Sequence, residues 1–467
     1  MCNNELKVKV TTRYWYDREF INRNLSNEKY VTNAINNSYL NWHSGRPVVI
    51  SAQTGAGKNT FIENVLIPES AKQKKKILIV SNRIALSIQM KKRILELTNM
   101  TFYNNDHLMD TDIFQHVYVY TYHKFFAQKN NLKADEFLYV VLDEAHFFTS
   151  DALFNYKTGL VLDSIPKQFK DSIRIYMSAT LDEVGADIVI AEEKAHEERF
   201  KREYLQIEFY ELEQNYSHIN AKYFNDIPEL QEEIFFDKTN DDKWLIFVTN
   251  KEEGISLQKK LVEKKIDAIW LDADSKINSK ELFFDILEKE SFANKVLIST
   301  SVLDNGINFN DEQLKNIVIF SYNKTQLLQM LGRKRLNKDS NVNLYLHNKT
   351  AGMLNGYRRI LDDKLKAINL YKTDKEDFYR TYFNQGIDYF KIIDGLFYFN
   401  NEKCYYNRPG YSKLTKDIEF LNNMIQKLKD DPNVYIKEQL SWLGVENTYT
   451  EQNWINIGGK LQSKKKL

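Results

Sequence analysis

A glycine-rich segment near the N-terminus carries residues that could hold a phosphate group. The apolar run 48–50 leads into a loop and then a helical stretch, and the loop residues expected to contact phosphates are Thr54, Gly55, Ala56, Gly57 and Lys58. Glycines let backbone N–H groups curl around phosphate oxygens without Cβ clashes. The following helix N-terminus adds partial positive charge, and the Lys58 amine would reach the β and γ phosphates. The strand–loop–helix order favours this interpretation over an incidental glycine turn beside a lysine.

The residue after Lys58 departs from the usual pattern of such loops. A serine or threonine hydroxyl normally binds Mg²⁺ there, whereas this chain has Asn59 followed by Thr60. The Asn59 amide oxygen could replace the hydroxyl, directly or through water. Alternatively, Thr60 takes over, or Mg²⁺ binding is weakened. The sequence leaves these three alternatives open.

A pair of carboxylates follows another apolar run, at 138–142. Asp143 would lie at the carboxyl edge of a strand, where it can hold Mg²⁺ directly or through its water. The adjacent Glu144 can then orient and deprotonate an attacking water. Phosphoryl transfer needs mainly positioning and charge neutralisation, which these groups supply. Together with the upstream loop, the pair predicts a site for ATP and Mg²⁺.

The elements that would position these residues alternate between short apolar strands and helices. Five β-branched or aliphatic runs in the first half are typical of strands buried on both faces: 48–50, 77–80, 117–120, 138–142 and 173–177. A second set follows a charged stretch: 244–248, 268–271, 296–299, 317–320 and 342–346. Strands separated by helices, such as the stretch 84–97, imply βαβ units. The pattern predicts two α/β domains in series, each with a parallel sheet.

The predicted organisation has four parts. They are an N-terminal helical extension (1–44), an ATP-binding domain (45–205), a second α/β domain (206–350) and an accessory α-rich domain (351–467). The last part has helical periodicity at 353–371 and 411–429, and its segment 396–406 resembles a hairpin with an Asn400–Asn401 turn. Its aromatic side chains are expected to be mainly core.

Further motifs, in order along the chain, resemble those of superfamily 2 DEAD/DEAH-box helicases. Asp143 to His146 is similar to the DEAH-type motif II, and residues 52–58 resemble motif I. Ser178-Ala179-Thr180 resembles motif III, and residues 81–83 and Thr121 fall where motifs Ia and Ib are expected. Residues 296–309 resemble motif V, and residues 329–335 resemble motif VI. The resemblance covers about residues 45–350 and implies two tandem RecA-like domains followed by the α-rich region.

The resemblance also implies a role for each matching residue. His146, Ser178 and Thr180 would couple hydrolysis to domain movement, while Arg83, Thr121 and Thr300 would contact the nucleic-acid backbone. Asp304 and Gly306 would lie near the nucleotide. In motif VI, Arg333 would act as an arginine finger, with Gln329 and Arg335 as further catalytic residues. Arg335 follows Arg333 by two positions instead of the usual three, so Arg333 is the better-supported finger.

Bulk composition limits the alternatives without choosing among them. The net charge is only +1 and the chain has two cysteines, which excludes a disulfide framework or a thiolate metal cluster. The first ten residues lack a signal-like apolar stretch and no run is long enough to span a bilayer. We therefore expect a cytoplasmic protein with no membrane partner. Its expected partner is a nucleic acid, with single-stranded DNA favoured and RNA possible, and protein partners could bind the C-terminal region.

The sequence supports one leading function and two alternatives. The leading interpretation is a helicase or translocase, which couples ATP hydrolysis to translocation on, or unwinding of, DNA or RNA. A nucleotide-gated clamp subunit that hydrolyses poorly would explain Asn59 and the altered motif VI spacing, although the intact Glu144 argues against it. A P-loop ATPase acting on protein is the third possibility.

Overall fold

The protein, described here by a computed structural model, consists of two compact units, each formed from two stretches of the chain. The structure describes residues 15–82, 84–98, 108, 110–199, 205–237, 239–272, 275, 280–300, 307–335 and 341–455. Met1–Glu213 and Tyr357–Phe420 form the first unit, and Gln214–Gly356 and Leu421–Leu467 form the second. Each unit is built around its own parallel sheet.

The first unit contains an eight-stranded sheet in the order β1-β8-β2-β7-β6-β3-β5-β4, in which only the β4–β5 pair is antiparallel. The strands are β1 (Ile21–Ser26), β2 (Pro47–Ser51), β3 (Lys76–Ser81), β4 (Ile113–Phe114), β5 (Val117–Thr121), β6 (Phe137–Leu142), β7 (Ile173–Ser178) and β8 (Ile207–Leu212). The five predicted strands are confirmed as β2, β3, β5, β6 and β7.

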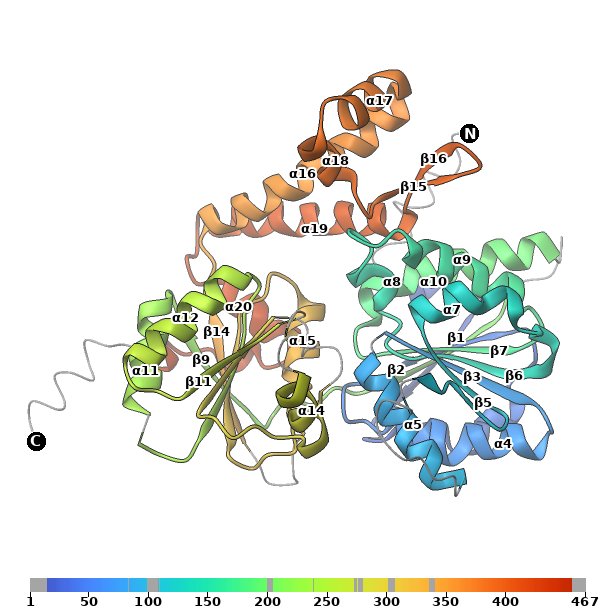
Figure 1. Cartoon of the computed structure of the whole chain (residues 1–467), viewed down its shortest axis with the longest axis horizontal. Helices are drawn as coiled ribbons and strands as arrows, with labels where there is room; N and C mark the ends of the chain where they lie inside the picture. The colour runs from blue at the N-terminus through green and yellow to red at the C-terminus, as the bar shows by residue number, and fades with distance from the viewer. Residues whose placement is uncertain are drawn as a thin grey trace, which may run out of the picture. The chain divides into compact units, whose positions relative to one another are not determined.

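Helices cover both faces of this sheet because successive strand residues bury apolar side chains on opposite sides. Val49 belongs to one core, whereas its neighbours Val48 and Ile50 belong to the other. Figure 1 shows the helices above and below the sheet. The first core is covered by α7 (Tyr122–Gln128), α9 (Lys157–Gln168) and α10 (Leu181–Arg199). The second is covered by α2 (Val31–Ile35), α3 (Lys58–Phe61), a π-helical turn (Ile62–Leu66), α4 (Ile67–Lys72) and α5 (Ile84–Thr98).

The second unit repeats the architecture with a six-stranded, all-parallel sheet in the order β11-β12-β10-β13-β14-β9. Its strands are β9 (Ile219–Phe224), β10 (Lys243–Phe247), β11 (Ala268–Leu271), β12 (Val296–Ser299), β13 (Leu314–Ile319) and β14 (Val342–His347). Its helices are α11 (Ile227–Phe236), α12 (Lys251–Glu263), α14 (Lys280–Lys289), α15 (Lys324–Leu331) and α20 (Val434–Trp442). The fold is therefore two tandem RecA-like domains, as predicted.

The domain limits differ from those predicted at the N-terminal side. The 1–44 segment was expected to be a helical extension, but it contributes β1 to the first sheet, where β1 pairs with β8. Because β8 also pairs with β2, the first unit continues to Glu213 and does not end at residue 205. Four of the six β1 residues are polar and exposed or partly exposed, so no apolar run indicates this edge strand.

The C-terminal region contains the predicted helices and hairpin. Its elements are α16 (Ala351–Thr373), α17 (Lys375–Asn384), α18 (Ile387–Ile393), β15 (Phe397–Asn400), β16 (Lys403–Tyr406) and α19 (Arg408–Lys427), followed by α20. The hairpin turn falls on Asn401 and Glu402, both with positive φ. Within the described residues, no helix has the length and apolar character needed to cross a bilayer.

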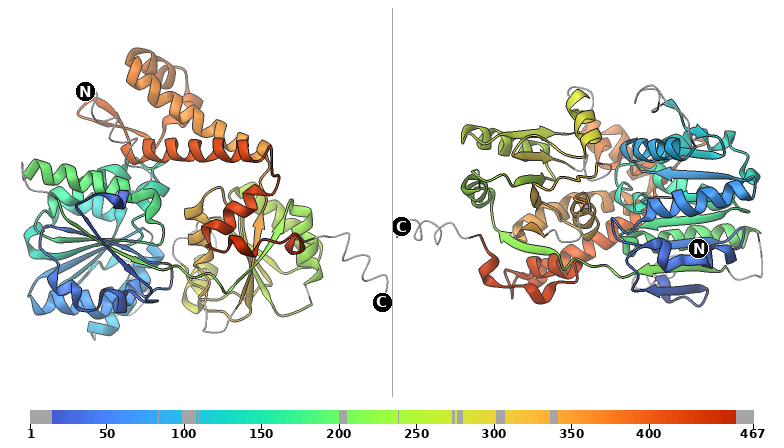
Figure 2. Two further views of the ribbon diagram at one scale, coloured as in Figure 1. Left: turned by 180° about the vertical axis from the view of Figure 1, so that it is seen from behind. Right: turned by 90° about the horizontal axis from the view of Figure 1, so that it is seen from below.

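The region 351–467 does not form one accessory domain, because side chains tie its two halves to different units. In the first unit, the Asn407 amide donates to the Ala152 carbonyl (2.9 Å) and to the Thr158 hydroxyl (2.8 Å). In the second unit, the Tyr435 hydroxyl donates to the Ser321 carbonyl at 3.2 Å. Figure 2 shows α20 against the sheet of the second unit. Buried hydrogen bonds of this kind carry no sequence periodicity, so the division was not predictable.

Replacing Asn407 with alanine tests this anchor. We expect Asn407→Ala to lower the free energy of unfolding of the first unit by about 2 kcal/mol, because a buried carbonyl and hydroxyl lose their partner. Chemical denaturation measures the loss, and limited proteolysis within residues 357–420 should accelerate. Asn369→Ala, at an exposed position of α16, is the control. Equal stability of the two variants would contradict the anchoring role.

Candidate nucleotide site

The loop after β2 has the backbone conformation that its glycines allow. Gly55 and Gly57 have φ of 87° and 75°, in the left-handed region that β-carbon-bearing residues rarely adopt. Gly57 is the N-cap of α3. The Ala52 N–H donates to the Ser178 carbonyl at 3.1 Å, which joins the end of β2 to the end of β7. The loop therefore leads directly into a helix N-terminus at the carboxyl edge of the sheet.

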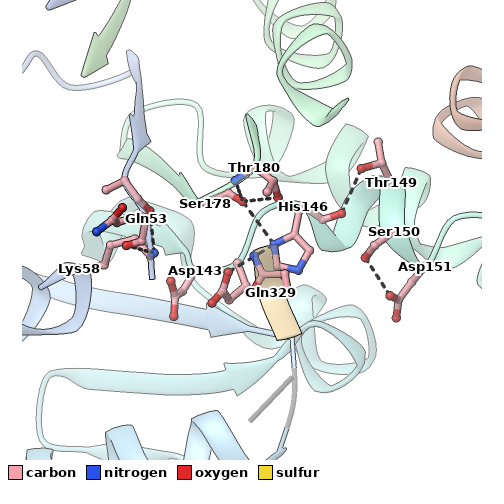
Figure 3. A network of polar contacts seen from close by, with 12 residues as sticks. Gln53, Lys58, Asp143, His146, Thr149, Ser150, Asp151, Ser178, Thr180 and Gln329 are labelled. Carbon is pink, nitrogen blue, oxygen red and sulfur yellow. Dashed lines mark hydrogen bonds and ion pairs between the residues drawn. The ribbon is translucent and has the colours of Figure 1, made fainter. Parts of the chain in front are cut away.

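Lys58 is the first residue of α3, and its side chain reaches back to this loop. Its side chain is buried, and its amine donates to the carbonyls of Ala52 (3.0 Å) and Gln53 (3.4 Å), as Figure 3 shows. The Thr54 hydroxyl oxygen is buried without a hydrogen-bond partner. A buried cation beside an unsatisfied hydroxyl and a helix N-terminus is an environment suited to anionic oxygens.

Asn59 and Thr60 occupy the first turn of α3 with different exposure. Asn59 is half-buried, whereas Thr60 is exposed. This difference favours Asn59 over Thr60 as the side chain that could reach a metal ion in the loop.

Asp143 follows β6, and its carboxylate is buried in the same part of the unit. Its N–H donates to the Val80 carbonyl at 2.9 Å, while its Oδ1 atom has no hydrogen-bond partner. Burial, and then the charge of Glu144, raises the pKa of Asp143 to about 6, with Lys58 acting in the opposite direction. A desolvated carboxylate with a free oxygen fits a divalent cation.

Glu144 has a strained backbone. Its φ is 54°, in the left-handed region, and its side chain is 8% exposed. For a residue with a β-carbon this conformation costs roughly 1 kcal/mol or more, and it persists where the surroundings enforce it. The next residue, Ala145, donates its N–H to the Met177 carbonyl at 2.8 Å. The surroundings thus hold Glu144 in a strained backbone conformation and bury a carboxylate that could activate water.

The three residues expected to couple hydrolysis to movement form one buried network. His146 Nδ1 lies 3.3 Å from both Glu144 Oε2 and Ser178 Oγ. Ser178 Oγ accepts from the Thr180 N–H at 3.0 Å and lies 3.4 Å from Thr180 Oγ1. Figure 3 shows these side chains joining the end of β6 to the end of β7. The structure thus brings the predicted motif II and motif III residues together.

Of the residues expected to contact nucleic acid in this unit, only Thr121 lies within the described residues, since Arg83 lies outside them. Thr121 pairs with Ser81 in the β3–β5 register and accepts from the Lys124 N–H at 3.1 Å as the N-cap of α7.

The second unit brings two of the predicted motif VI residues together. Arg333 is buried, and its guanidinium donates to the Gln329 side-chain oxygen (3.1 Å) and backbone carbonyl (3.2 Å). Arg335 is half-buried and donates its backbone N–H to the Phe309 carbonyl at 2.8 Å. Thr300 is half-buried after β12, and Asp304 and Gly306 lie outside the described residues.

Sequence reasoning missed Tyr122 as a residue of the site. Its hydroxyl donates to the backbone carbonyl of Asp143 at 3.0 Å from a fully buried position. A tyrosine at the start of a helix has the pattern of an ordinary core residue, so the sequence contains no signal for this contact.

A phosphate-binding loop and an acidic pair at the edge of a parallel sheet, followed by a second RecA-like domain, define the class of nucleic-acid-dependent ATPases of the helicase type. The first unit matches the family model described as type III restriction enzyme, res subunit, over residues 16–183. Residues 226–335 match the helicase conserved C-terminal domain. The chain belongs to superfamily 2 of the helicases.

Solved structures also resemble the chain. S. cerevisiae Dbp5 L327V bound to RNA and ADP BeF3 is 16% identical, with a TM-score of 0.49, covering 67% of this chain and 83% of that one. The DEAD-box helicase Mss116 bound to ssRNA and UDP-BeF is 13% identical, with a TM-score of 0.48 and coverage of 82% and 84%. Mycobacterium smegmatis helicase Lhr bound to ssDNA and AMP-PNP is 15% identical, with a TM-score of 0.47 and coverage of 69% and 46%. No curated protein matches the chain significantly.

The raised pKa of Asp143 predicts that its carboxylate destabilises the nucleotide-free protein at neutral and alkaline pH. A raised carboxyl pKa means that the folded state binds the proton more tightly than the unfolded chain. The folded state is therefore favoured below about pH 4 and loses this advantage as pH rises through about 6. Asp143→Asn should raise the free energy of unfolding at pH 8 by about 1–3 kcal/mol.

Denaturant titrations at several pH values measure this effect. The gain from Asp143→Asn should shrink at pH 5, where the wild-type carboxyl is largely protonated. Asp135→Asn, at an exposed position, should show no such pH dependence. A gain that stays constant from pH 5 to pH 8 would mean that the Asp143 charge is not the cause.

Proposed function

We propose that this protein is an ATP-driven helicase or translocase that moves along or unwinds a nucleic acid, with single-stranded DNA as the favoured track and RNA as the alternative. The observation that carries the proposal is the combination of buried Lys58 after β2 with buried Asp143 and Glu144 after β6, two strands that both pair with β7. A protein that only bound nucleotide would have no use for a strained general base at this position.

The residues present fit MgATP as substrate. Gly55, Gly57 and Lys58 would hold the phosphates, and the unsatisfied oxygens of Thr54 and Asp143 support a polar ligand between them. Asp143 and Asn59 would hold Mg²⁺, with Thr60 as a less buried alternative. Bound there, the metal ion would neutralise charge on the phosphate oxygens.

The remaining roles concern hydrolysis and its coupling to movement. Glu144 would take a proton from the attacking water, and its contact with His146 Nδ1 supports a link from Glu144 to Ser178 and Thr180. We assign the arginine-finger role to Arg333, which Gln329 orients, with Arg335 as an accessory cation.

The nucleic-acid contacts follow the motif positions. We assign backbone contacts to Arg83, Thr121 and Thr300, and we place Asp304 and Gly306 near the nucleotide. The split C-terminal region is a candidate surface for protein partners.

The polymer dependence of ATP hydrolysis tests the proposal. We expect steady-state ATPase activity to rise at least tenfold with one of single-stranded DNA, duplex DNA or single-stranded RNA. Glu144→Gln should lower the stimulated kcat by two to four orders of magnitude, because general-base catalysis contributes about that factor. Filter binding of the same polymers is the control, and it should be unchanged in this variant. A rate that no polymer raises would contradict the proposal.

Asn59 favours one rival, a nucleotide-gated clamp that binds nucleic acid and hydrolyses ATP weakly. Asn59→Thr restores the usual metal-binding hydroxyl and distinguishes the two functions. For a motor already adapted to Asn59, kcat should change less than about threefold, whereas a clamp should gain an order of magnitude or more, about 1.4 kcal/mol in the barrier. Mg²⁺ titration of each variant shows whether the change acts through the metal.

A further inference from the structure

Tyr122 connects the segment expected to touch nucleic acid with the acidic pair. It is the first residue of α7, directly after Thr121, and its side chain is fully buried. The hydroxyl donates to the Asp143 carbonyl at 3.0 Å. Burial, and then the carboxylates of Asp143 and Glu144, raises the pKa of Tyr122 well above its ordinary value, so the hydroxyl remains a donor.

Aromatic contacts hold the Tyr122 ring in place. The ring stacks on Phe147 with a centroid separation of 4.4 Å and an interplanar angle of 6°. Phe148 lies edge-on to it at 5.0 Å. Phe147 and Phe148 begin α8 (Phe147–Ser150), directly after the 143–146 segment. Tyr122 therefore bonds to the first residue of the 143–146 segment, Asp143, and packs on the two residues that follow the segment, Phe147 and Phe148.

The Asp143 carbonyl belongs to the peptide that precedes Glu144. The plane of this peptide sets φ of Glu144, which is held at 54°. Backbone hydrogen bonds fix the neighbouring groups, from the Asp143 N–H to Val80 (2.9 Å) and from the Ala145 N–H to Met177 (2.8 Å). The Tyr122 hydroxyl fixes the carbonyl between them, so rotation of this peptide to relieve the strain would break a buried hydrogen bond.

We propose that Tyr122 is a positioning residue for ATP hydrolysis: it holds the Asp143–Glu144 peptide so that Glu144 faces the reacting water, and it makes this orientation depend on the corner between β5 and α7. The inference rests on the proposed function, since Thr121 at that corner is assigned to the nucleic-acid backbone. A bound nucleic-acid strand that displaced the corner between β5 and α7 would move Tyr122. Because the buried side chains are closely packed, this displacement would reach the Asp143–Glu144 peptide.

The resulting signature is a change in kcat without a change in binding. Lys58 and the glycine loop do not depend on the Tyr122 hydroxyl, so KM for ATP should be unaffected. Tyr122→Phe keeps the ring and its stacking but loses the hydrogen bond. We expect kcat at saturating polymer to fall about three- to tenfold, with KM for ATP and the half-saturating polymer concentration within about twofold of wild type.

Tyr176→Phe is the matched control. Tyr176 is a fully buried tyrosine of the same core whose hydroxyl donates to Glu192 Oε1 at 2.7 Å instead of to the Asp143–Glu144 peptide. It should lose a comparable amount of thermal stability and keep the wild-type kcat. If Tyr122→Phe keeps the wild-type kcat, or if both variants lose kcat equally, Tyr122 has no positioning role.

A second measurement asks whether Tyr122 acts through Glu144. In a Glu144→Gln background, Tyr122→Phe should leave the residual single-turnover rate unchanged, because the group that it positions is already disabled. A further three- to tenfold loss in that background would overturn the proposal. If no polymer stimulates the wild type, the proposed function fails, and the kcat contrast between the two tyrosine variants still tests Tyr122 on the basal rate.

Discussion

The candidate site depends on the parallel register of the central strands of the first sheet. Val80 pairs with Leu142, Leu142 pairs with Tyr176, and Ser51 pairs with Ser178. Four strands therefore end at one level, and the residues that follow them meet at the carboxyl edge, where ligands of open α/β sheets bind. Because apolar cores bury both faces of the sheet, a slip of one residue would misplace every strand side chain. The packing of the core thereby fixes the distances between proposed catalytic groups that lie far apart in the chain.

The same burial places opposed charges in a poorly solvated region. Desolvation disfavours the ionised Asp143, and the Lys58 amine donates hydrogen bonds to the Ala52 and Gln53 carbonyls. A carboxylate that lacks a hydrogen bond at one oxygen gains most from a cation, and a buried ammonium gains most from anionic oxygens. The site is thus less stable without its ligand than a neutral core would be. This loss of stability would be the physical counterpart of the proposed binding of a metal-bound polyphosphate.

The sequence predicted those parts of the fold and site that depend on local pattern. Apolar runs identified ten strands, and the order of the motifs brought Lys58, Asp143 and Ser178 to one sheet edge, where the structure has them. It did not predict β1, β8 or β9, because their exposed or partly buried polar residues obscure the apolar pattern, nor β4, which has only two residues. Nor could it predict the left-handed Glu144 or the Tyr122 hydrogen bond, since both arise from tertiary contacts. The separate anchoring of residues 357–420 depends on single buried side chains such as Asn407.

That anchoring changes how the C-terminal region must be understood. Arg408 pairs with Asp163 of α9 and with Asp187 of α10, and buried Lys413 pairs with Glu183 of α10. Helix α10 begins directly after Thr180, and Ala152, which accepts from Asn407, lies shortly after the 143–146 segment. The contacts therefore lie on the two stretches of chain that follow β6 and β7. Ion pairs with a buried partner and buried amide hydrogen bonds resist rearrangement, so residues 357–420 belong to the same packed body as the site. A force applied to residues 357–420 would therefore act on α9 and α10, the helices that follow motifs II and III, and not on a flexible linker.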